Sequence, residues 1–351
     1  MTADTAKHRD PRIDIIKGIA ILLVLIGHVI QYASGAEYQR VGAFYDNVLF
    51  KFIYGFHMPL FMVVSGYLFY RTVCHKSPKD VIVSRLKTLI VPIFAFSLIE
   101  WIFRFNPQYS FFDQIRNYLS VTRYTLWFLW ALFYSSMGVL VGHYLFKDNV
   151  LIWLVLILAS FMTPDKWFSE CYKYTFPCFL FGYYVNKHDW TLQLKKNLKL
   201  IASVCGFLYI GCLFFYDTDC FVYMSGCDIL SGGGIDFRQL GVDIFRIIVG
   251  ILGSVFVISL VLLLYHPANE GLPMGFLARI GMDTMGIYCF QYYFFYLFAP
   301  RISSGMVPMD SWGGVLANRL LCLILVFTIS FGLTWAVKRI KVLDVLFLGG
   351  R

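Results

Sequence analysis

Long apolar segments alternate with short charged connectors along the whole of this 351-residue chain. Apolar runs of about 17 to 25 residues bounded by charge, Pro or Gly are typical of membrane-spanning helices. The pattern predicts an all-α, polytopic integral membrane protein of about ten transmembrane helices, forming one domain over residues 1–351. The expected spans are 15–33, 49–70, 86–104, 125–146, 150–163, 174–187, 199–216, 240–264, 280–299 and 315–337.

Composition excludes a soluble globular protein. Hydrophobic residues make up 59% of the chain and charged residues 15%, with a mean hydropathy of +0.67. The net charge of +9 would favour a nucleic-acid partner in a soluble chain, but here Lys and Arg gather in connectors between spans, so we expect no nucleic-acid partner. The basic connectors are the N-terminus, 71–87, 187–199 and the C-terminus, which all fall on one side, so both termini are expected in the cytoplasm.

The first predicted helix carries a polar stripe. Asp14, Lys17 and His28 fall on one face of an otherwise apolar segment, within about 40° of one line. With ~1.5 Å of rise per residue, the stripe runs ~16 Å from Lys17 at the membrane surface to His28 well inside the bilayer. Ionisable groups at that depth are candidates for function, so we expect a reaction or a conduction path there.

A second histidine is expected at the same depth. His57 lies two positions before Pro59, which leaves the carbonyl of Gly55 without its usual helical partner. Counting inward along the spans places His28, His57 and Glu100 in the same third of the membrane. A carboxylate beside a histidine can fix its tautomer and stabilise its charged form, which makes all three catalytic candidates. The alternative for Glu100 is a simple pair with Arg104, one turn along the helix.

Further residues are candidates for binding substrates. Lys17 and Arg85 lie where spans meet the cytoplasm and, with Asp14, form a candidate site for an anionic cosubstrate, although orientation alone also explains basic connectors. Ser65 is a candidate substrate contact or a helix-packing residue. Trp127 fits either a sugar-stacking surface or an aromatic belt at the membrane surface.

Three other patterns have simpler explanations. Asp243 and Arg246 are spaced to neutralise each other within one span. The nine cysteines contain no C-x-x-C pair, so no metal site is expected, while Cys220 and Cys227 share one loop and either form a disulfide or remain separate. His143 and Asp148 have the H-x-x-x-x-D spacing of a general base, without a recognisable partner motif.

The segments 105–124 and 217–239 are expected as connectors on the face opposite the basic connectors, the latter with a flexible turn at 231–234.

Several motifs occur in one order along nearly the whole chain. They are D-x-x-KGIAILLVLIGH (14–28), FHMPLFMVVSGY (56–67), R-x-x-x-L-x-x-P (85–92), LWFLWALF (126–133), FPCFLFGYY (176–184), IGMDTMGIYCFQ (280–291) and a basic tail ending in LFLGG. Together they resemble the acyltransferase 3 family of integral membrane acyltransferases, most of all its sugar O-acetylase and fucose O-acetylase-like branch. Each motif is weak alone, whereas the ordered set is specific.

The resemblance implies an O-acyltransferase that moves an acyl group, usually acetyl, from cytoplasmic acetyl-CoA to a hydroxyl of an extracytoplasmic or lipid-linked carbohydrate, in a bacterial inner membrane. It implies that His28 is the family's histidine of the first span and that Lys17 stands where many relatives have Arg. Gln291 occupies a position where many relatives have His, so a hydrogen bond is retained but proton transfer is not. The alternative is a proton-coupled transporter or flippase for a glycan or small anion, in which the buried His and Glu residues relay protons.

Overall fold

The structure is a computed structural model that describes residues 10–35, 43–162, 169–191, 196–231, 234–265 and 272–350. The first half of the chain contains α1 (Pro11–Tyr32), η2 (Ala43–Asp46), α2 (Val48–Tyr54), α3 (His57–His75), α4 (Pro78–Arg85), the π-helix η3 (Leu86–Ile90), α5 (Val91–Phe103), α6 (Phe111–Tyr124), α7 (Trp127–Phe146), α8 (Val150–Phe161) and α9 (Ser169–Lys187). The second half contains α11 (Leu198–Leu213), η4 (Thr218–Cys220), α12 (Val222–Ser225), α13 (Phe237–Leu264), α14 (Leu272–Met282), α15 (Thr284–Ser303), α16 (Trp312–Lys338) and α17 (Lys341–Leu348). Strands β1 (Leu230–Ser231) and β2 (Gly234–Ile235) pair antiparallel in one short hairpin. The expected all-α fold is therefore confirmed for the described residues.

Within the part of the chain that the structure describes, six helical segments are long and apolar enough to cross a membrane. They are Pro11–Tyr32, Val48–His75, Pro78–Phe103, Trp127–Phe146, Phe237–Leu264 and Trp312–Lys338. Helices α8 and α11 are apolar but shorter. Helices α9 and α15 overlap the predicted spans 174–187 and 280–299, but polar and tyrosine side chains lower their hydropathy. The expected count of about ten spans is thus not confirmed.

Pro59 interrupts the second predicted span, as its sequence indicated. Proline has no amide hydrogen to bond to the carbonyl four residues earlier. The structure divides the predicted 49–70 span into α2 and α3, with the break at Gly55 and Phe56. The Tyr209 hydroxyl on α11 donates to the carbonyl of Phe52, which the break leaves without its helical amide. His57 consequently stands at the first turn of α3 rather than in the middle of a helix.

Paired glycines allow the central helices to cross closely. A Cβ added to Gly66 on α3 would lie 1.8 Å from a backbone carbonyl oxygen of α9, and one added to Gly182 on α9 would lie 1.9 Å from a carbonyl oxygen of α3. Gly18 and Gly281 make the same kind of crossing between α1 and α14. Membrane helices commonly associate through such small residues, because backbone-to-backbone packing replaces a hydrophobic driving force.

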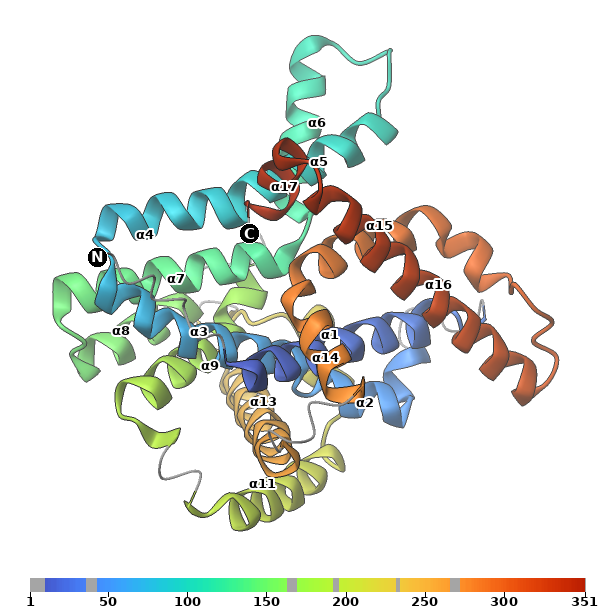
Figure 1. The fold of residues 1–351 in the computed structure, drawn as a ribbon. Helices are drawn as coiled ribbons and strands as arrows, with labels where there is room; N and C mark the ends of the chain where they lie inside the picture. The colour runs from blue at the N-terminus through green and yellow to red at the C-terminus, as the bar shows by residue number, and fades with distance from the viewer. Residues whose placement is uncertain are drawn as a thin grey trace, which may run out of the picture.

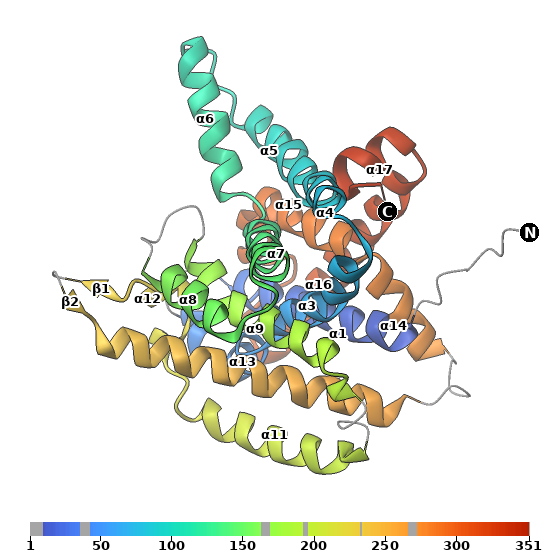
Figure 2. The same ribbon diagram turned by 90° about the vertical axis from the view of Figure 1, so that its left-hand side faces the viewer.

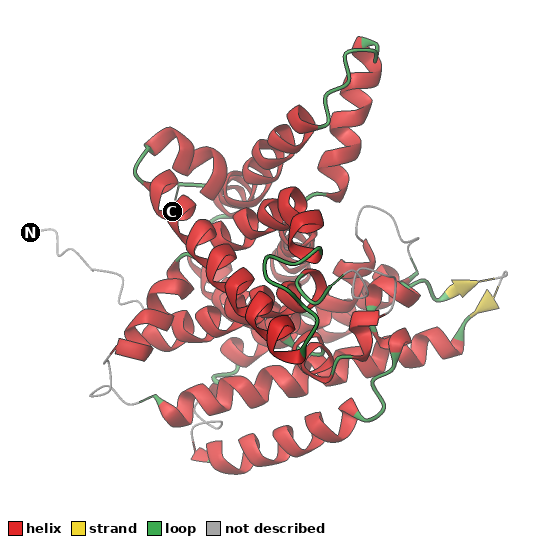
Figure 3. Ribbon diagram, turned by 90° about the vertical axis from the view of Figure 1, so that its right-hand side faces the viewer, coloured by secondary structure: helices red, strands yellow, loops and turns green. Residues whose placement is uncertain are grey.

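The central helices are α1, α3 and α9, with α7 and α4 along one side and α15 and α16 along another (Figure 1). Helix α11 packs on α13 and forms an outer layer of the body (Figure 2). The β1–β2 hairpin lies at one end of α13 (Figure 3). The hairpin of α5 and α6 projects away from the rest of the body in all three views (Figures 1 to 3).

Helix α6 lies where the sequence predicted only a connector. Ser110 caps its first turn, because its hydroxyl accepts from the amide of Asp113 at 3.3 Å and donates to the Asp113 carboxylate at 2.7 Å. The hydrogen bond from Ser110 and the charge of Arg116 lower the pKa of Asp113 below its usual value. The 105–124 segment is thus an ordered helical hairpin arm rather than an irregular loop.

Candidate active site

His28 and His57 line one cavity of about 450 Å³. Helices α1, α2, α3, α7 and α15 form its walls together with the segment after α11. Its lining is rich in aromatic side chains, including Tyr32, Tyr54, Tyr124, Trp127, Tyr216, Tyr223, Tyr288, Tyr292 and Tyr296. Polar ring edges around two imidazoles suit a ligand that has both apolar faces and hydroxyl groups.

His28 is oriented by Gln291. The His28 Nδ1 atom lies 2.8 Å from Oε1 of Gln291, and Gln291 Nε2 donates to the carbonyl of Tyr288 at 3.2 Å. The amide is thereby turned so that its oxygen faces the imidazole, and Nδ1–H donates to it. The other ring nitrogen of neutral His28, Nε2, then carries a lone pair and can accept a proton.

His57 has the same tautomer for a different reason. Its Nδ1 atom lies 2.9 Å from the carbonyl of Ile53, one turn earlier across the helix break. A carbonyl only accepts, so Nδ1–H donates and Nε2 of the neutral ring is left as an acceptor. The irregular backbone that Pro59 causes therefore fixes the His57 imidazole, which is 4% exposed and packs against Tyr54 with the ring centroids 4.6 Å apart and the planes tilted by 53°.

A second cavity, of about 260 Å³, adjoins the histidine cavity. Lys17, Arg85 and Ser65 all line it, so the structure brings together three residues that the sequence proposed as binding groups. Met58 and Tyr288 line both cavities and form the wall between them. We call the first the histidine cavity and the second the basic cavity.

The cationic groups of the basic cavity are held by neighbouring side chains. Lys17 Nζ lies 3.2 Å from the carboxylate of Asp14, which is itself 5% exposed. The guanidinium of Arg85 lies over the ring of Phe69, 4.7 Å from its centroid. Asp14 thus positions Lys17 rather than lining either cavity.

Glu100 does not contact either histidine. Its Oε1 atom pairs with Arg104 at 2.6 Å, and its Oε2 atom accepts from the Thr125 hydroxyl at 3.0 Å. Both carboxylate oxygens are used, and Glu100 lines neither cavity. The expectation that Glu100 orients a histidine is therefore corrected to its alternative, the pair with Arg104, because the carboxylate is held between the residues that directly follow α5 and α6.

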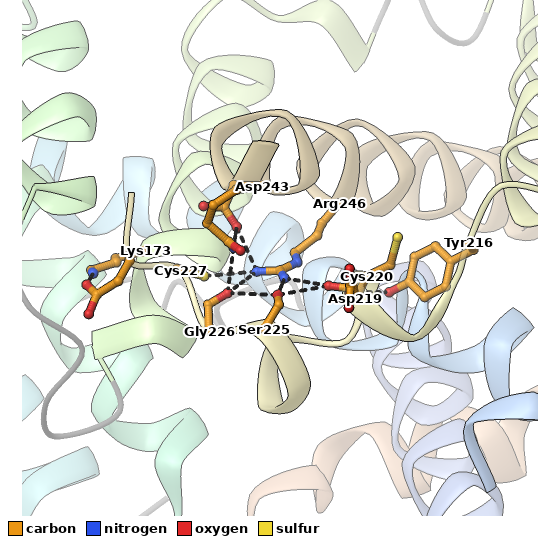
Figure 4. A network of polar contacts seen from close by, with 11 residues as sticks. Lys173, Tyr216, Asp219, Cys220, Ser225, Gly226, Cys227, Asp243 and Arg246 are labelled. Atoms are coloured by element: carbon orange, nitrogen blue, oxygen red, sulfur yellow. Dashed lines mark hydrogen bonds and ion pairs between the residues drawn. The ribbon is translucent and has the colours of Figure 1, made fainter. Parts of the chain in front are cut away.

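Arg246 is a member of the histidine cavity that sequence reasoning undervalued. It pairs with Asp243 at 2.8 Å, as the spacing predicted, and the two side chains are 2% and 0% exposed. The same guanidinium also donates to the carbonyls of Gly226 at 2.8 Å and Asp219 at 2.9 Å (Figure 4). It thereby fastens the segment 219–227 against α13, where part of that segment lines the histidine cavity. A buried arginine in an apolar span was the signal available in the sequence.

Cys220 and Cys227 have separate partners, and no disulfide joins these two described residues. Cys227 lies against the guanidinium of Arg246 at 3.0 Å, whereas the Cys220 thiol lies 3.3 Å from the Asp217 carboxylate. Burial, followed by the hydrogen bond to Asp217, raises the pKa of Cys220 to about 12. Although Cys220 lines the histidine cavity, it is protonated at neutral pH and is a weak nucleophile.

The His143–Asp148 pair forms a network away from both cavities. His143 Nδ1 lies 3.1 Å from Asp148, which also binds the Tyr183 hydroxyl and the Lys187 ammonium group at 2.7 Å. This carboxylate joins the turn after α7 to α9, and none of these four residues lines the histidine cavity or the basic cavity. The network therefore explains the H-x-x-x-x-D spacing structurally. Among the described residues, no group of three or more His, Cys, Asp or Glu side chains could hold a metal ion.

Comparison with known proteins gives the family of this chain. The family model described as an acyltransferase domain matches residues 10–338. The chain belongs to the acyltransferase family. Both histidines, Lys17, Arg85 and Gln291 fall within the matched part of this membrane acyltransferase.

Two curated relatives of the acyltransferase are nodulation proteins named NolL. The protein from Mesorhizobium japonicum is 32% identical over 182 residues, which cover 50% of this chain and 48% of the relative. The protein from Sinorhizobium fredii is 30% identical over 226 residues, which cover 60% and 58% of the respective chains. The acyltransferase thus spans about half the length of the curated relatives that it matches. No solved structure matches it.

Proposed function

We propose that this acyltransferase moves an acetyl group from cytoplasmic acetyl-CoA to a hydroxyl of an extracytoplasmic or lipid-linked carbohydrate. One observation carries the proposal: the basic cavity and the histidine cavity share Met58 and Tyr288 as a common wall. Cations gather on one side of that wall and proton acceptors on the other. A donor with an anionic head and a reactive end needs this separation.

The donor side is the basic cavity. Lys17 and Arg85 supply positive charge for the phosphates of acetyl-CoA, and arginine adds a bidentate grip that lysine lacks. Along α1 the distance from Lys17 to His28 is ~16 Å, which suits a pantetheine arm reaching from a cytoplasmic phosphate site to a reaction centre in the membrane. Ser65, on the wall of the basic cavity, is placed to contact that arm.

The chemistry belongs to the histidine cavity. The acceptor hydroxyl attacks the thioester carbonyl while Nε2 of His28 accepts its proton, and the C–S bond then breaks and the CoA thiolate takes up a proton. In an equivalent route, Nε2 of His28 attacks the thioester carbonyl and the C–S bond breaks, so that CoA leaves as a thiolate. The acceptor hydroxyl then attacks the acetyl-imidazole, the C–N bond breaks, and the hydroxyl proton passes to the thiolate. In neither route does Gln291 transfer a proton, because its side-chain amide only orients the His28 ring. His57 supplies a second lone pair in the same cavity.

The acceptor side is aromatic. Trp127 and the tyrosines around the histidines offer flat apolar faces for a sugar ring and hydroxyl groups at their edges. Positive charge in the 71–87 connector and at the C-terminus supports a cytoplasmic location of those segments, and we propose that the histidine cavity opens toward the opposite face. We place the protein in a bacterial inner membrane with both termini in the cytoplasm.

Incubation of native membranes with acetyl-labelled acetyl-CoA tests the proposal. We expect label in an extractable glycan with the wild-type protein and its loss with His28→Ala, by about 10² to 10⁴-fold in rate. His143→Ala is the matched control, because it removes a half-buried histidine outside both cavities and should keep its activity. Wild-type membranes that transfer no label, but that move a glycan across the bilayer, would instead support the transporter alternative.

A further inference from the structure

Helix α6 is amphipathic and exposes its apolar face. Phe111, Phe112, Ile115 and Leu119 are 73%, 80%, 42% and 48% exposed. At about 100° per residue these four side chains fall within one arc of about 100°. The neighbouring arc, of about 120°, holds polar side chains, which are Asp113, Arg116, Asn117, Ser120 and Arg123. The spanning helices differ, because they are apolar over most of their surface.

The position of α6 matches the membrane surface. Helix α5 ends at Phe103 as the last part of a predicted spanning segment, and α6 begins only at Phe111. With 14 residues, α6 is ~21 Å long, which is too short to cross a bilayer. It runs crosswise to α11 and α13 and projects sideways from the body (Figure 2). An apolar arc on one side and arginines beside it are typical of helices that lie in the interface plane.

The base of this arm is joined to the histidine cavity. Tyr124, the last residue of α6, and Trp127, the first of α7, both line it. Arg104 at the end of α5 donates to the hydroxyl of Tyr296, another lining residue, at 2.9 Å. The C-terminal end of α6 therefore forms part of the wall of the histidine cavity.

We propose that α6 lies in the headgroup region of the leaflet on which the histidine cavity opens, with Phe111, Phe112, Ile115 and Leu119 among the acyl chains. Arg116 and Arg123 then reach the lipid phosphates, since arginine side chains extend toward the polar surface. The exposed surface of α6 guides a lipid-anchored acceptor toward the histidine cavity. This guiding role rests on the proposed function. The partner of the apolar arc is the lipid itself.

Fluorescence quenching tests the membrane contact without any assay of activity. Phe112→Cys and Ser120→Cys, each in a cysteine-depleted full-length protein, are labelled with an environment-sensitive fluorophore and reconstituted in phosphatidylcholine–phosphatidylglycerol vesicles. Both positions are exposed on the same helix, about 80° apart, with Phe112 in the apolar arc and Ser120 in the polar arc. We expect a lipid spin-labelled on the upper part of its acyl chain to quench position 112 several-fold more than position 120. Equal quenching at both positions, or cross-linking between the 112 positions of two copies, would overturn the proposal.

A second measurement tests the guidance of the acceptor. We expect Phe112→Ser with Ile115→Ser to raise the KM for a lipid-linked acceptor several-fold and to leave transfer to a short soluble glycoside unchanged, with Phe112→Leu as the conservative control. An unchanged KM for the lipid-linked acceptor would overturn the guiding role. Wild-type protein that acetylates neither acceptor would refute the proposed function, while the quenching result would still stand by itself.

Discussion

At the scale of single residues, the two imidazoles of the histidine cavity are prepared for the same task by different partners. A side-chain amide holds Nδ1 of His28, and the backbone carbonyl of Ile53 at the helix break holds Nδ1 of His57. In both rings Nε2 is the proton acceptor, so the cavity contains two bases and no carboxylate partner for either among its described lining residues. Gln291 and the carbonyl of Ile53 take the orienting role that the sequence had suggested for Glu100.

Gln291 is therefore expected to act through His28. Gln291→Ala should lower kcat by about 10-fold, which is less than the loss in His28→Ala, because the imidazole can then adopt the other tautomer. The KM for acetyl-CoA should stay unchanged, since Gln291 lies in the histidine cavity only. Initial rates over a range of acetyl-CoA concentrations separate the two constants. Gln291→Glu keeps an acceptor oxygen and should retain more activity than Gln291→Ala, whereas wild-type rates in Gln291→Ala would disprove the orienting role.

Substitutions in the basic cavity are expected to have a different kinetic effect. Lys17→Ala and Arg85→Ala should each raise the KM for acetyl-CoA with a smaller change in kcat, because they remove charge that binds the donor before and during reaction. Lys17→Arg should retain much of the activity, since positive charge is preserved. Arg71→Ala is the control, because Arg71 lines a separate cavity of about 690 Å³. If Arg71→Ala raises this KM and Arg85→Ala does not, the donor binds in that separate cavity.

At the scale of secondary-structure elements, close crossings and one buried ion pair hold the site together. Helix α3 carries His57 at one end and crosses α9 at Gly66, so the crossing sets where the imidazole lies. Arg246 performs a similar task for the segment after α11, because removing one partner of a buried pair leaves the other charge unsatisfied, at a cost of about 3–5 kcal/mol. The shape of the histidine cavity thus depends on contacts that lie outside it.

The crossing can be tested by adding a single methyl group. Gly66→Ala should strongly destabilise the protein, because the new Cβ would meet a carbonyl oxygen of α9 at 1.8 Å and backbone cannot move aside as a side chain can. Gly211→Ala on α11 is the matched control, since a Cβ there meets nothing within 4 Å and replaces a poor helix former. The midpoint of thermal unfolding in detergent measures the stability of both variants. Equal midpoints for the two variants would show that α3 and α9 are not in close contact.

At the scale of the whole molecule, the two cavities are lined by residues from opposite ends of the same helices. The basic cavity gathers Lys17 near the start of α1 with Arg85 and Thr284, while the histidine cavity gathers His28 near the end of α1 with Tyr124 and Tyr296. This is the arrangement expected when successive helices cross a membrane in alternating directions. It supports a donor and an acceptor that approach from opposite faces.

The sequence predicted much of this arrangement because helix geometry is regular. The common depth of His28 and His57 followed from counting residues along apolar spans, and the structure places both in one cavity. It did not predict α6, since a short amphipathic helix has no apolar run. Nor did it predict the further partners of Arg246 beyond Asp243, which lie 19 to 27 residues away in an irregular segment. Glu100 was misplaced because depth along a helix does not determine the direction of a side chain.

Transfer across a sealed membrane tests the central claim most directly. Oriented vesicles with the cytoplasmic face outward receive acetyl-labelled acetyl-CoA outside and hold a glycan acceptor inside. We predict that label appears on the enclosed acceptor with the wild-type protein and with His143→Ala, and is absent with His28→Ala. Label that appears only when donor and acceptor share one side of the membrane would contradict a path from the basic cavity to the histidine cavity.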